Sequence, residues 1–283
     1  MQELIRVSNL NYHYTDAPAV LHNINLLINE GEYIALIGPN GCGKTTLIRH
    51  FNALLQPSSG DVSICGLNTR STKNILEIRR LVGMIFQNPD NQIVGMSVEE
   101  DVAFGPGNLG LPAQEMRRRV QAALEMTGLQ GLEKRPPHTL SGGQKQLLAL
   151  AGMLAMEPKM IALDEPTASL DPDGKNKVLS LLKDLNSRGI GIIHVTHNME
   201  EAALADRVLV MEKGEIIADG SAANILSRVE WLKSLGLAPP RITELLWTLQ
   251  QQGEVLAGNI FTVEAAAKEI GALLKRLRGF EHV

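Results

Sequence analysis

The chain has 283 residues, 44% hydrophobic and 20% charged, an ordinary globular composition with enough length for a large core and a smaller one. Its net charge of −4 and the lack of any basic run longer than Arg117–Arg119 disfavour a nucleic-acid partner. No apolar stretch approaches the roughly 20 residues that a membrane-spanning helix needs. The start of the sequence lacks the charged and apolar blocks of a signal peptide. We therefore expect a protein that is made and kept in the cytosol.

The first half of the chain predicts a pair of long strands and then strands and helices in turn. Alternating apolar residues at 5–14 and 20–28 indicate a meander of strands. A short apolar run at 33–38 ends in glycine, and residues 45–55 have helical spacing. The other elements expected here are strands at 62–65 and 81–86 and helical segments from 97 to 128, with Pro112 at the first position of one helix.

The second half continues the alternation. The expected elements are a helix at 142–156, a strand at 160–164, a helix at 174–187, a strand at 191–195 and a hairpin that turns at Lys213–Gly214. Strands that alternate with helices predict an α/β fold with a largely parallel sheet and helices on its faces.

Composition changes after about residue 222. Helices are expected at 222–235 and 242–253, and a last helix from Thr262 carries apolar residues along one side. We interpret this region as a separate helical appendage. Its apolar side can pack on its own domain or against a partner, and the sequence does not distinguish the two.

The segment Gly38–Thr45 fits the phosphate-loop pattern G-x-x-x-x-G-K-[ST], and it lies where that motif must lie, after a strand and at the start of a helix. Backbone N–H groups from Asn40 to Thr46 would surround a β-phosphate. Lys44 would neutralise β- and γ-phosphate oxygens, and the Thr45 hydroxyl would hold Mg²⁺. The candidate nucleotide-binding residues here are Gly38, Pro39, Asn40, Gly41, Cys42, Gly43, Lys44, Thr45 and Thr46.

The two cysteines, Cys42 and Cys65, are too few for a metal cluster or a disulfide framework. Cys42 lies in the anion-binding loop beside a lysine, and such surroundings lower the pKa of a thiol. We therefore expect Cys42 to be alkylated in the empty protein and protected by bound nucleotide.

The run from Met160 to Glu165 is an apolar strand that ends in two adjacent carboxylates. Adjacent side chains at a strand end can face different ways, so the pair can do two jobs. Asp164 suits an outer-sphere hold on Mg²⁺, and Glu165 suits a general base that polarises an attacking water. The alternative, two solvated acids in a loop, weakens once a phosphate loop is present.

Three further side chains are candidates because of their positions in or after strands. His197 follows a strand at the edge where ligands bind in open α/β sheets, which favours a γ-phosphate contact over a structural role. Gln87 follows another strand and can contact both the Mg²⁺ shell and a neighbouring protein. Tyr14, 24 residues before the phosphate loop, can stack on adenine or simply pack in its strand. By alternation His194 points to the opposite face, into the core or the surface.

A second glycine-rich helix start is the sequence LSGGQKQ at 140–146. Ser141 is a plausible N-cap, and Gln144 completes a capping box. A cap does not explain Gly142 and Gly143, because each costs about 1 kcal/mol relative to alanine in a helix. Bare backbone at a helix N-terminus suits the approach of an anion.

Together these motifs have the order and spacing of the ATP-binding-cassette (ABC) ATPases, which the chain resembles over roughly residues 3–222. The resemblance rests on the phosphate loop, Gln87, LSGGQ, the carboxylate pair, Ala168–Asp171 and His197. More narrowly, the segment 86–112 and the helical tail are similar to the ATPase subunits of energy-coupling-factor transporters, which include cobalt and nickel importers.

The resemblance implies an α/β fold: an ABC-type P-loop ATPase domain at 1–222 and a small C-terminal helical domain at 223–283 that contributes to dimerisation. The ATPase domain would contain a RecA-like mixed sheet core, an antiparallel β subdomain and, at about 88–158, a helical subdomain that carries the signature.

In this family two cassettes dimerise head to tail, and each ATP is clamped between the phosphate loop of one subunit and LSGGQ of the other. The resemblance implies ATP and Mg²⁺ as cofactors. The implied catalytic residues are Glu165, His197, Gln87 and Lys44, and the implied metal-binding residues are Thr45, Gln87 and Asp164. Ser141, Gly143 and Gln144 would be supplied in trans, and Gly142, Asp171 and Tyr14 complete the implied nucleotide-binding set.

The implied partners are a second cassette, identical or paralogous, an integral membrane coupling subunit that docks near Gln87, Asp90 and Gln92, and a substrate-binding membrane component. The chain would be a peripheral protein on the cytoplasmic side of the cell membrane and would not bind nucleic acid. Its implied function is an ATP-hydrolysing motor for uptake of a vitamin or of cobalt or nickel ions. The cargo is not encoded here, because substrate choice would lie in other subunits.

Two alternatives are weaker. An ABC ATPase of nucleic-acid repair or translation needs a long coiled coil between phosphate loop and signature, or two cassettes in one chain, and this sequence has neither. A scaffold that binds ATP without hydrolysis is disfavoured by Glu165 and His197. One departure from the family is Leu147, which stands where an arginine usually follows LSGGQ-x-Q. Because the groups expected at the γ-phosphate are intact, we expect activity to be retained.

Overall fold

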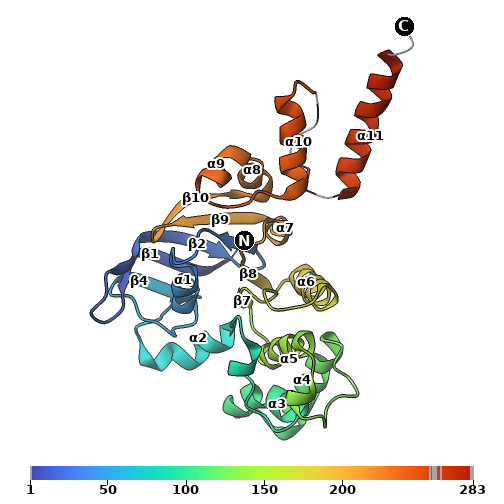
Figure 1. Ribbon diagram of the computed structural model, residues 1–283. Helices are drawn as coiled ribbons and strands as arrows, with labels where there is room; N and C mark the ends of the chain where they lie inside the picture. The colour runs from blue at the N-terminus through green and yellow to red at the C-terminus, as the bar shows by residue number, and fades with distance from the viewer. Residues whose placement is uncertain (1, 255, 257–259, 262, 281–283) are drawn as a thin grey trace.

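The computed structural model describes residues 2–254, 256, 260–261 and 263–280. Figure 1 shows a central sheet with an antiparallel sheet of N-terminal strands beside it, a group of helices from 98–154 below it and the helices after residue 222 above it. The last two helices project away from the rest of the molecule.

The antiparallel sheet is built from the N-terminal strands and a later hairpin. Its strands are β1 (Glu3–His13), β2 (Ala19–Asn29), β4 (Ser59–Ile64) and β5 (Leu67–Asn68), in the order β2-β1-β4-β5. Apolar residues of this sheet, such as Leu10 and Ile28, share a core with Phe51 of α1 (Lys44–Phe51). The predicted strand meander is therefore confirmed.

The central sheet contains β3 (Tyr33–Ile37), β6 (Val82–Ile85), β7 (Met160–Asp164), β8 (Gly191–Val195), β9 (Arg207–Glu212) and β10 (Glu215–Ser221), in the order β10-β9-β3-β8-β7-β6. Neighbours from β9 to β6 are parallel, and β10 is antiparallel at the edge. Successive residues face opposite sides, so Ala35 packs in one core and Leu36 in the other. Both faces are covered, which explains the continuous apolar runs and confirms the predicted mixed α/β fold.

The helices after the first strands lie around this sheet. They are α2 (Ile75–Leu81), α3 (Val98–Asn108), α4 (Ala113–Met126), α5 (Gly142–Leu154), α6 (Pro172–Ser187) and α7 (Met199–Ala202), with short 3₁₀ turns η1 (Thr72–Asn74), η2 (Pro89–Asn91) and η3 (Pro137–Thr139). Helices α3, α4 and α5 pack on one another and form a helical subdomain. Its apolar residues join the core on the face of the central sheet opposite the antiparallel sheet.

Two predicted helix starts differ from the structure. Pro112 is the residue before α4 rather than its first residue, because its ψ of 144° is not helical. Helix α6 begins at Pro172, earlier than predicted, because the Asp171 side chain accepts a hydrogen bond from the Gly174 N–H and Pro172 fits the first helical position.

The C-terminal helices are α8 (Ala222–Leu226), α9 (Val229–Ser234), α10 (Arg241–Gln251) and α11 (Val263–Phe280). The single helix predicted at 222–235 is wrong, because α8 ends before Ser227 and α9 starts after Arg228. The predicted start at Thr262 lies outside the described residues.

The apolar residues of α8 and α9 belong to the large core, as Leu226 and Leu232 do. A separate small core is formed by Leu246, Leu256, Ala266 and Leu273. We therefore propose that the second domain begins near Pro239 rather than at residue 223.

Candidate functional site

The strand order brings the candidate residues to one edge of the central sheet. The phosphate loop follows β3, His197 follows β8, Glu165 follows β7 and Gln87 follows β6, and these four strands are consecutive neighbours. Because they are parallel, their carboxyl ends meet at the same edge, where ligands bind in α/β sheets. The cleft there has a volume of about 780 Å³ and is lined by Val20, Gly38, Pro39, Asn40, Gly41, Gly43, Lys44, Thr45, Thr46, Gln87, Glu165, His197 and residues 235–238.

Two glycines of the phosphate loop are required by close packing. A Cβ on Gly38 would lie 2.2 Å from the Met211 carbonyl oxygen, and one on Gly43 would lie 2.9 Å from the Leu21 side chain. Both have positive φ, of 153° and 107°. Larger residues would therefore push the loop away from β9 and β2, and the loop would lose its shape.

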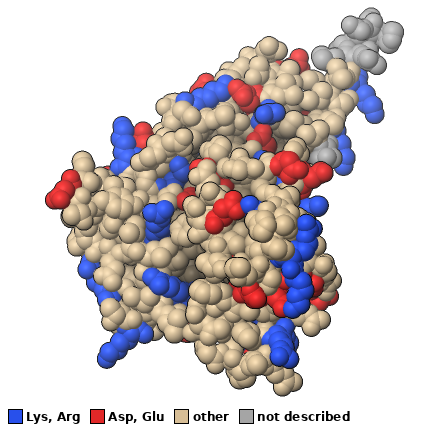
Figure 2. Space-filling view, turned by 60° about the horizontal axis from the view of Figure 1, so that its bottom comes forward, with Lys and Arg blue, Asp and Glu red and all other residues tan. Residues whose placement is uncertain are grey.

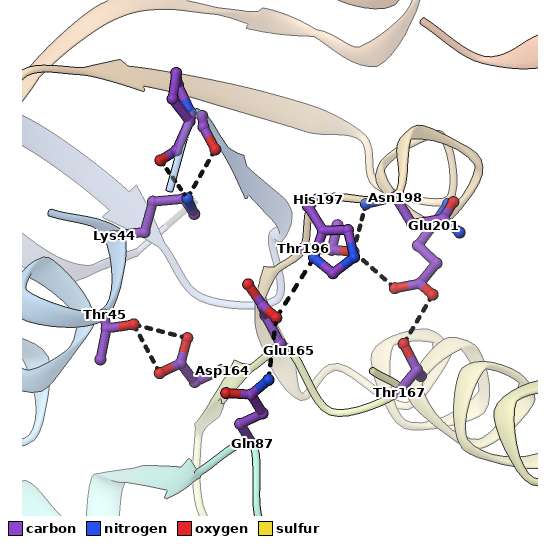
Figure 3. Close-up of polar contacts among 12 residues, drawn as sticks. Lys44, Thr45, Gln87, Asp164, Glu165, Thr167, Thr196, His197, Asn198 and Glu201 are labelled. Carbon is purple, nitrogen blue, oxygen red and sulfur yellow. Dashed lines mark hydrogen bonds and ion pairs between the residues drawn. The ribbon is translucent and has the colours of Figure 1, made fainter. Parts of the chain in front are cut away.

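Lys44 contacts backbone carbonyls of the phosphate loop, and Thr45 contacts the carboxylate of Asp164. The buried Lys44 ammonium donates hydrogen bonds to the carbonyls of Gly38 (2.7 Å) and Pro39 (2.9 Å), inside its own loop. The Thr45 hydroxyl donates to Asp164 at 2.8 and 3.0 Å (Figure 3). Burial raises the pKa of Asp164, and the Thr45 hydrogen bond opposes that shift.

The Thr45 and Asp164 oxygens are of the kind that Mg²⁺ prefers. Among the described residues no group of three His, Cys, Asp or Glu could hold a metal alone. One hydroxyl and one carboxylate suit a magnesium ion whose other ligands are water and phosphate oxygens.

The expected lowering of the Cys42 thiol pKa is wrong. Cys42 is buried, and burial raises the pKa of its thiol more than the neighbouring Lys44 lowers it. The Lys44 Nζ lies 3.9 Å from the sulfur because it is drawn toward the loop carbonyls. The sequence motif predicts a lysine beside Cys42, but it does not predict that the thiol is buried away from water.

Glu165, His197 and Gln87 form a second group of contacts. The Glu165 Oε2 lies 3.4 Å from His197 Nδ1 and accepts a hydrogen bond from Gln87 Nε2 at 3.4 Å (Figure 3). Glu165 has a φ of 49°, and its N–H donates to the Val195 carbonyl. This left-handed backbone turns Glu165 away from Asp164, so the adjacent carboxylates face different groups.

Tyr14 and His194 lie outside the cleft lining. The Tyr14 ring is half-exposed, and its hydroxyl is 3.1 Å from the Thr46 hydroxyl at the start of α1. It packs edge-to-face on Tyr12, with ring centroids 5.0 Å apart. His194 is fully buried, so of the two places that the alternation allowed, the structure selects the core.

The signature at 140–146 starts α5 with the expected capping box. The Ser141 hydroxyl accepts from the Gln144 N–H at 3.3 Å, and the Gln144 side chain accepts from the Ser141 N–H at 3.0 Å. A Cβ on Gly143 would lie 3.2 Å from Gly174 Cα, so packing of α5 on α6 accounts for this glycine. Among the described residues, a Cβ on Gly142 would meet only Leu170, at an ordinary 3.8 Å. Contacts between those residues therefore leave Gly142 unexplained.

The signature opens into a different cavity from the phosphate loop. This cavity of about 790 Å³ is lined by Ser141, Gly143, Gln144, Leu147, Asp171 and residues of α4 and α6. None of its lining residues lines the phosphate-loop cleft. The structure thus gathers the phosphate loop, Gln87, Glu165 and His197 in one cleft, and places Ser141, Gly143, Gln144 and Asp171 in another.

The sequence reasoning missed a buried polar cluster behind the cleft. It centres on Glu201, with Thr167, Lys175, His194 and Thr196 around it. In the sequence, Glu200 and Glu201 both follow His197 closely, so spacing alone does not show which glutamate is buried. Only the packing of α7 distinguishes the buried glutamate from the exposed one.

Comparison with known proteins identifies the family. The family model described as "ABC transporter" matches residues 21–168. A cobalt import ATP-binding protein CbiO from Syntrophus aciditrophicus is 52% identical over 270 residues, which are 95% of this chain and 96% of that protein. An energy-coupling factor transporter ATP-binding protein EcfA1 from Caldanaerobacter subterraneus is 48% identical over 93% of this chain and 97% of that protein. This chain is an ABC ATPase of the energy-coupling-factor type.

Solved structures of related cassettes have the same fold. CbiO1 of Clostridium perfringens, described as part of the ABC transporter complex cbiONQ, has a TM-score of 0.76 and 41% identity and covers 87% of this chain and 100% of that one. The cassette MJ0796, solved as a dimer with ADP and phosphate, has a TM-score of 0.70 and 30% identity and covers 77% and 99%. This cassette therefore binds ATP and hydrolyses it, and the hydrolysis of ATP is coupled to transport.

The family assignment also bears on the wider expectations. A dimer and membrane partners fit the relatives, and none of them supports the repair or translation alternative. Within the described part of the cassette, no helix combines the length and the hydropathy that a membrane span requires.

Proposed function

We propose that this cassette pairs head to tail with a second one, identical or paralogous, and that the pair binds two ATP molecules with Mg²⁺ to drive uptake of a micronutrient. The observation that carries the proposal is the placement of the phosphate loop and the signature in two separate cavities. Each cavity holds part of the groups that an ATP site of this family needs. A second subunit related by a two-fold axis completes both.

On the phosphate side, the N–H groups of the loop and the ammonium of Lys44 would bind the β- and γ-phosphates. Thr45 and Asp164 supply the oxygens that would hold Mg²⁺, with Gln87 beside them. The adenine would lie toward Tyr14, next to Thr46. The proposed nucleotide-binding residues of this half-site are Tyr14 and Gly38 to Thr46.

For hydrolysis, Glu165 is the proposed general base. Its carboxylate would accept a proton from the water that attacks the γ-phosphorus. His197 and Gln87, both 3.4 Å from its Oε2, would orient the water and contact the γ-phosphate. A magnesium ion, when bound, would neutralise charge that develops on the phosphate oxygens.

On the signature side, Ser141, Gly142, Gly143 and Gln144 would contact the γ-phosphate held by the partner subunit. The N–H groups at the start of α5 and the positive end of its dipole suit an anion there. Asp171 caps α6 in the same cavity and would approach the partner's nucleotide.

An apolar groove between the cassette core and the helical subdomain supports docking of a membrane coupling subunit. Leu76, Val94 and Phe104 line it, and each is more than half exposed. Gln92 also lines it, and its side chain accepts from the Phe86 N–H and donates to the Met84 carbonyl, at the end of β6. Because Gln87 follows Phe86 in the chain and lines the cleft, a shift of Gln92 on docking would displace Gln87 as well.

The names of the relatives limit the cargo that we propose. Relatives are described as cobalt import and energy-coupling factor transporter proteins. We propose a cobalt ion as cargo, in line with the name of one relative, or the nickel ion or vitamin that the resemblance to the family implies, chosen by a substrate-binding membrane component. The cassette would be a peripheral protein at the cytoplasmic side of the cell membrane.

The distribution of charge supports protein partners rather than nucleic acid. On the face seen in Figure 2, acidic and basic side chains are interspersed, and much of the surface carries neither. A nucleic-acid-binding face would concentrate Lys and Arg. The net charge of −4 agrees with this interpretation.

Complementation between two inactive variants tests the composite site. Lys44→Ala and Ser141→Ala should each abolish most hydrolysis. When they are mixed, half of the dimers contain one intact site of two, so we expect about a quarter of wild-type activity to return. The double variant Lys44→Ala/Ser141→Ala, mixed with an equal amount of wild type, is the control: its mixed dimers contain no intact site, so activity should fall to about the quarter that wild-type homodimers supply, instead of the half expected if each chain held a complete site. If mixing restores nothing while the variants still dimerise, the two cavities do not belong to one composite site.

A further inference from the structure

A buried carboxylate lies directly behind the hydrolysis site. Glu201, on the short helix α7, is 3% exposed, whereas Glu200 beside it is exposed. An ionised carboxylate that is withdrawn from water costs several kcal/mol unless charged or hydrogen-bonding partners compensate. The partners of Glu201 therefore show what its burial stabilises.

Two hydroxyl donors, a lysine ammonium and an imidazole nitrogen from other elements surround this carboxylate. Its Oε1 accepts from the Thr167 hydroxyl at 2.7 Å and lies 2.7 Å from Lys175 Nζ. Its Oε2 accepts from the Thr196 hydroxyl at 2.8 Å and lies 3.2 Å from His194 Nε2. Burial alone would raise the pKa of Glu201, but the contacts with His194, Lys175 and Thr167 outweigh burial and lower it. The carboxylate is therefore charged at neutral pH.

Two of these donors belong to the segments that carry the hydrolysis residues (Figure 3). Thr167 is the second residue after Glu165, and Thr196 immediately precedes His197. The Thr196 hydroxyl also accepts a hydrogen bond from the N–H of Asn198, at 3.0 Å. Both segments are thus attached to the same buried group.

We propose that Glu201 is a positioning residue for ATP hydrolysis, which holds the segments of Glu165 and His197 at the separation that the reaction needs. The inference rests on the roles proposed above for those two residues. Displacement of a reacting group by about 1 Å can cost about 10²-fold in rate. Glu201 does not line the cleft, so it acts through the two segments.

Lys175 extends the same cluster to the signature cavity. It lies on α6, whose N-terminal turn contains Gly174, the neighbour of Gly143. Glu201 thus connects the water-activating residues with the helix that supports the signature side.

The test uses Glu201→Gln, which keeps the size of the side chain and removes its charge, and Thr196→Val, which removes one hydroxyl. The matched control is Glu215→Gln, which makes the same change at an exposed glutamate on β10. We expect kcat of Glu201→Gln to fall about tenfold or more. The dissociation constant for ATP should stay within about threefold, because the phosphate loop is not altered. Glu215→Gln should leave both unchanged.

A double-mutant cycle separates positioning from general stability. If Glu201 acts through Thr196, the loss of kcat in Glu201→Gln/Thr196→Val will be smaller than the product of the single losses. Should Glu201→Gln not fold, Thr167→Val and Thr196→Val carry the test, and each should lower kcat at unchanged ATP affinity.

Two results would overturn the inference. One is a folded Glu201→Gln protein with wild-type kcat. The other is a loss of activity that matches the loss of folded protein, so that turnover per intact site is unchanged. Glu165→Gln, measured in parallel, separates the two proposals. Normal hydrolysis by Glu165→Gln would refute its role as general base. If Glu165→Gln is inactive while Glu201→Gln hydrolyses ATP at the wild-type rate, only the positioning role of Glu201 is refuted.

Discussion

The backbone of Glu165 decides what the two adjacent acids can do. In an extended strand neighbouring side chains already diverge, but a φ of 49° turns this residue further toward His197 and Gln87. Such a conformation costs a non-glycine residue about 1–3 kcal/mol and is concentrated at functional sites. The sequence predicted the pair of acids and their different roles. It did not predict the strained turn, which occurs where the Glu165 N–H donates to the Val195 carbonyl on the neighbouring strand, a contact between segments far apart in the chain.

Removal of the charge on Glu165 should stop hydrolysis but keep nucleotide binding. We expect Glu165→Gln to lower kcat by about 10²-fold or more, because an amide cannot accept the proton of the attacking water. The variant should accumulate as an ATP-bound dimer, which size-exclusion chromatography with and without ATP would detect. Glu215→Gln, on the exposed hairpin, is the control. Normal turnover of Glu165→Gln would remove it from the role of base.

The raised pKa of Cys42 predicts slow alkylation. At neutral pH less of its thiol is ionised than in an ordinary cysteine, and burial hinders the reagent further. Because Cys65 is less buried, Cys42 should react more slowly than Cys65. The rate for Cys42 should rise with pH as the thiolate forms, and ATP should slow it again. Labelling of Cys65→Ser and Cys42→Ser proteins, followed by mass spectrometry, measures each thiol alone; equal rates with and without ATP would contradict the protection.

At the scale of elements, the start of α5 combines two requirements. Gly143 allows α5 to approach α6 at Gly174, whereas Gly142 has room for a methyl group within the chain. The sequence presented both glycines as one signal for an anion. The structure divides them, since helix packing accounts for Gly143 but no contact among the described residues requires a glycine at position 142.

Alanine substitutions should separate these two reasons. Gly142→Ala should raise stability by about 0.5–1 kcal/mol through helix propensity, yet reduce ATP hydrolysis if the signature binds the partner's phosphate as proposed, because the methyl group would cover backbone at the start of α5. Gly143→Ala should destabilise the protein by about 1–3 kcal/mol, because the new Cβ presses on the α6 backbone. Thermal unfolding and ATPase rates on the same preparations would measure both. A Gly142→Ala protein with full activity would exclude close approach of a ligand there.

At the scale of the whole molecule, the C-terminal helices α10 and α11 form a small core of their own and project from the cassette. Their attachment to the cassette includes the contact of Arg241 with Glu200 on α7. Leu245 and Leu274 are exposed on these helices. Exposed apolar side chains on a projecting pair of helices suit contact with a second subunit.

A chain that ends after Ala238 should therefore keep its fold and lose affinity for the second cassette. Its melting temperature should change little, because every buried residue of the large core precedes residue 239 and only the partly buried Phe261 is lost from its edge. The protein concentration that gives half-maximal ATPase activity should rise about tenfold, which corresponds to about 1.4 kcal/mol of dimer contacts. Activity at high concentration should approach that of the full chain. Identical concentration dependence in both chains would exclude a role of this domain in dimerisation.

The sequence by itself determined the phosphate loop, the carboxylate pair, the signature and the strands that carry them, because each depends on local spacing and on the choice of residue. The tertiary structure alone decided which glutamate of α7 is buried, how Glu165 turns, why Gly143 is a glycine and that Cys42 is desolvated. These features depend on contacts between segments such as β7, β8 and α6, which lie far apart in the chain. Burial and close approach are set only when those segments pack, so local pattern cannot reveal them.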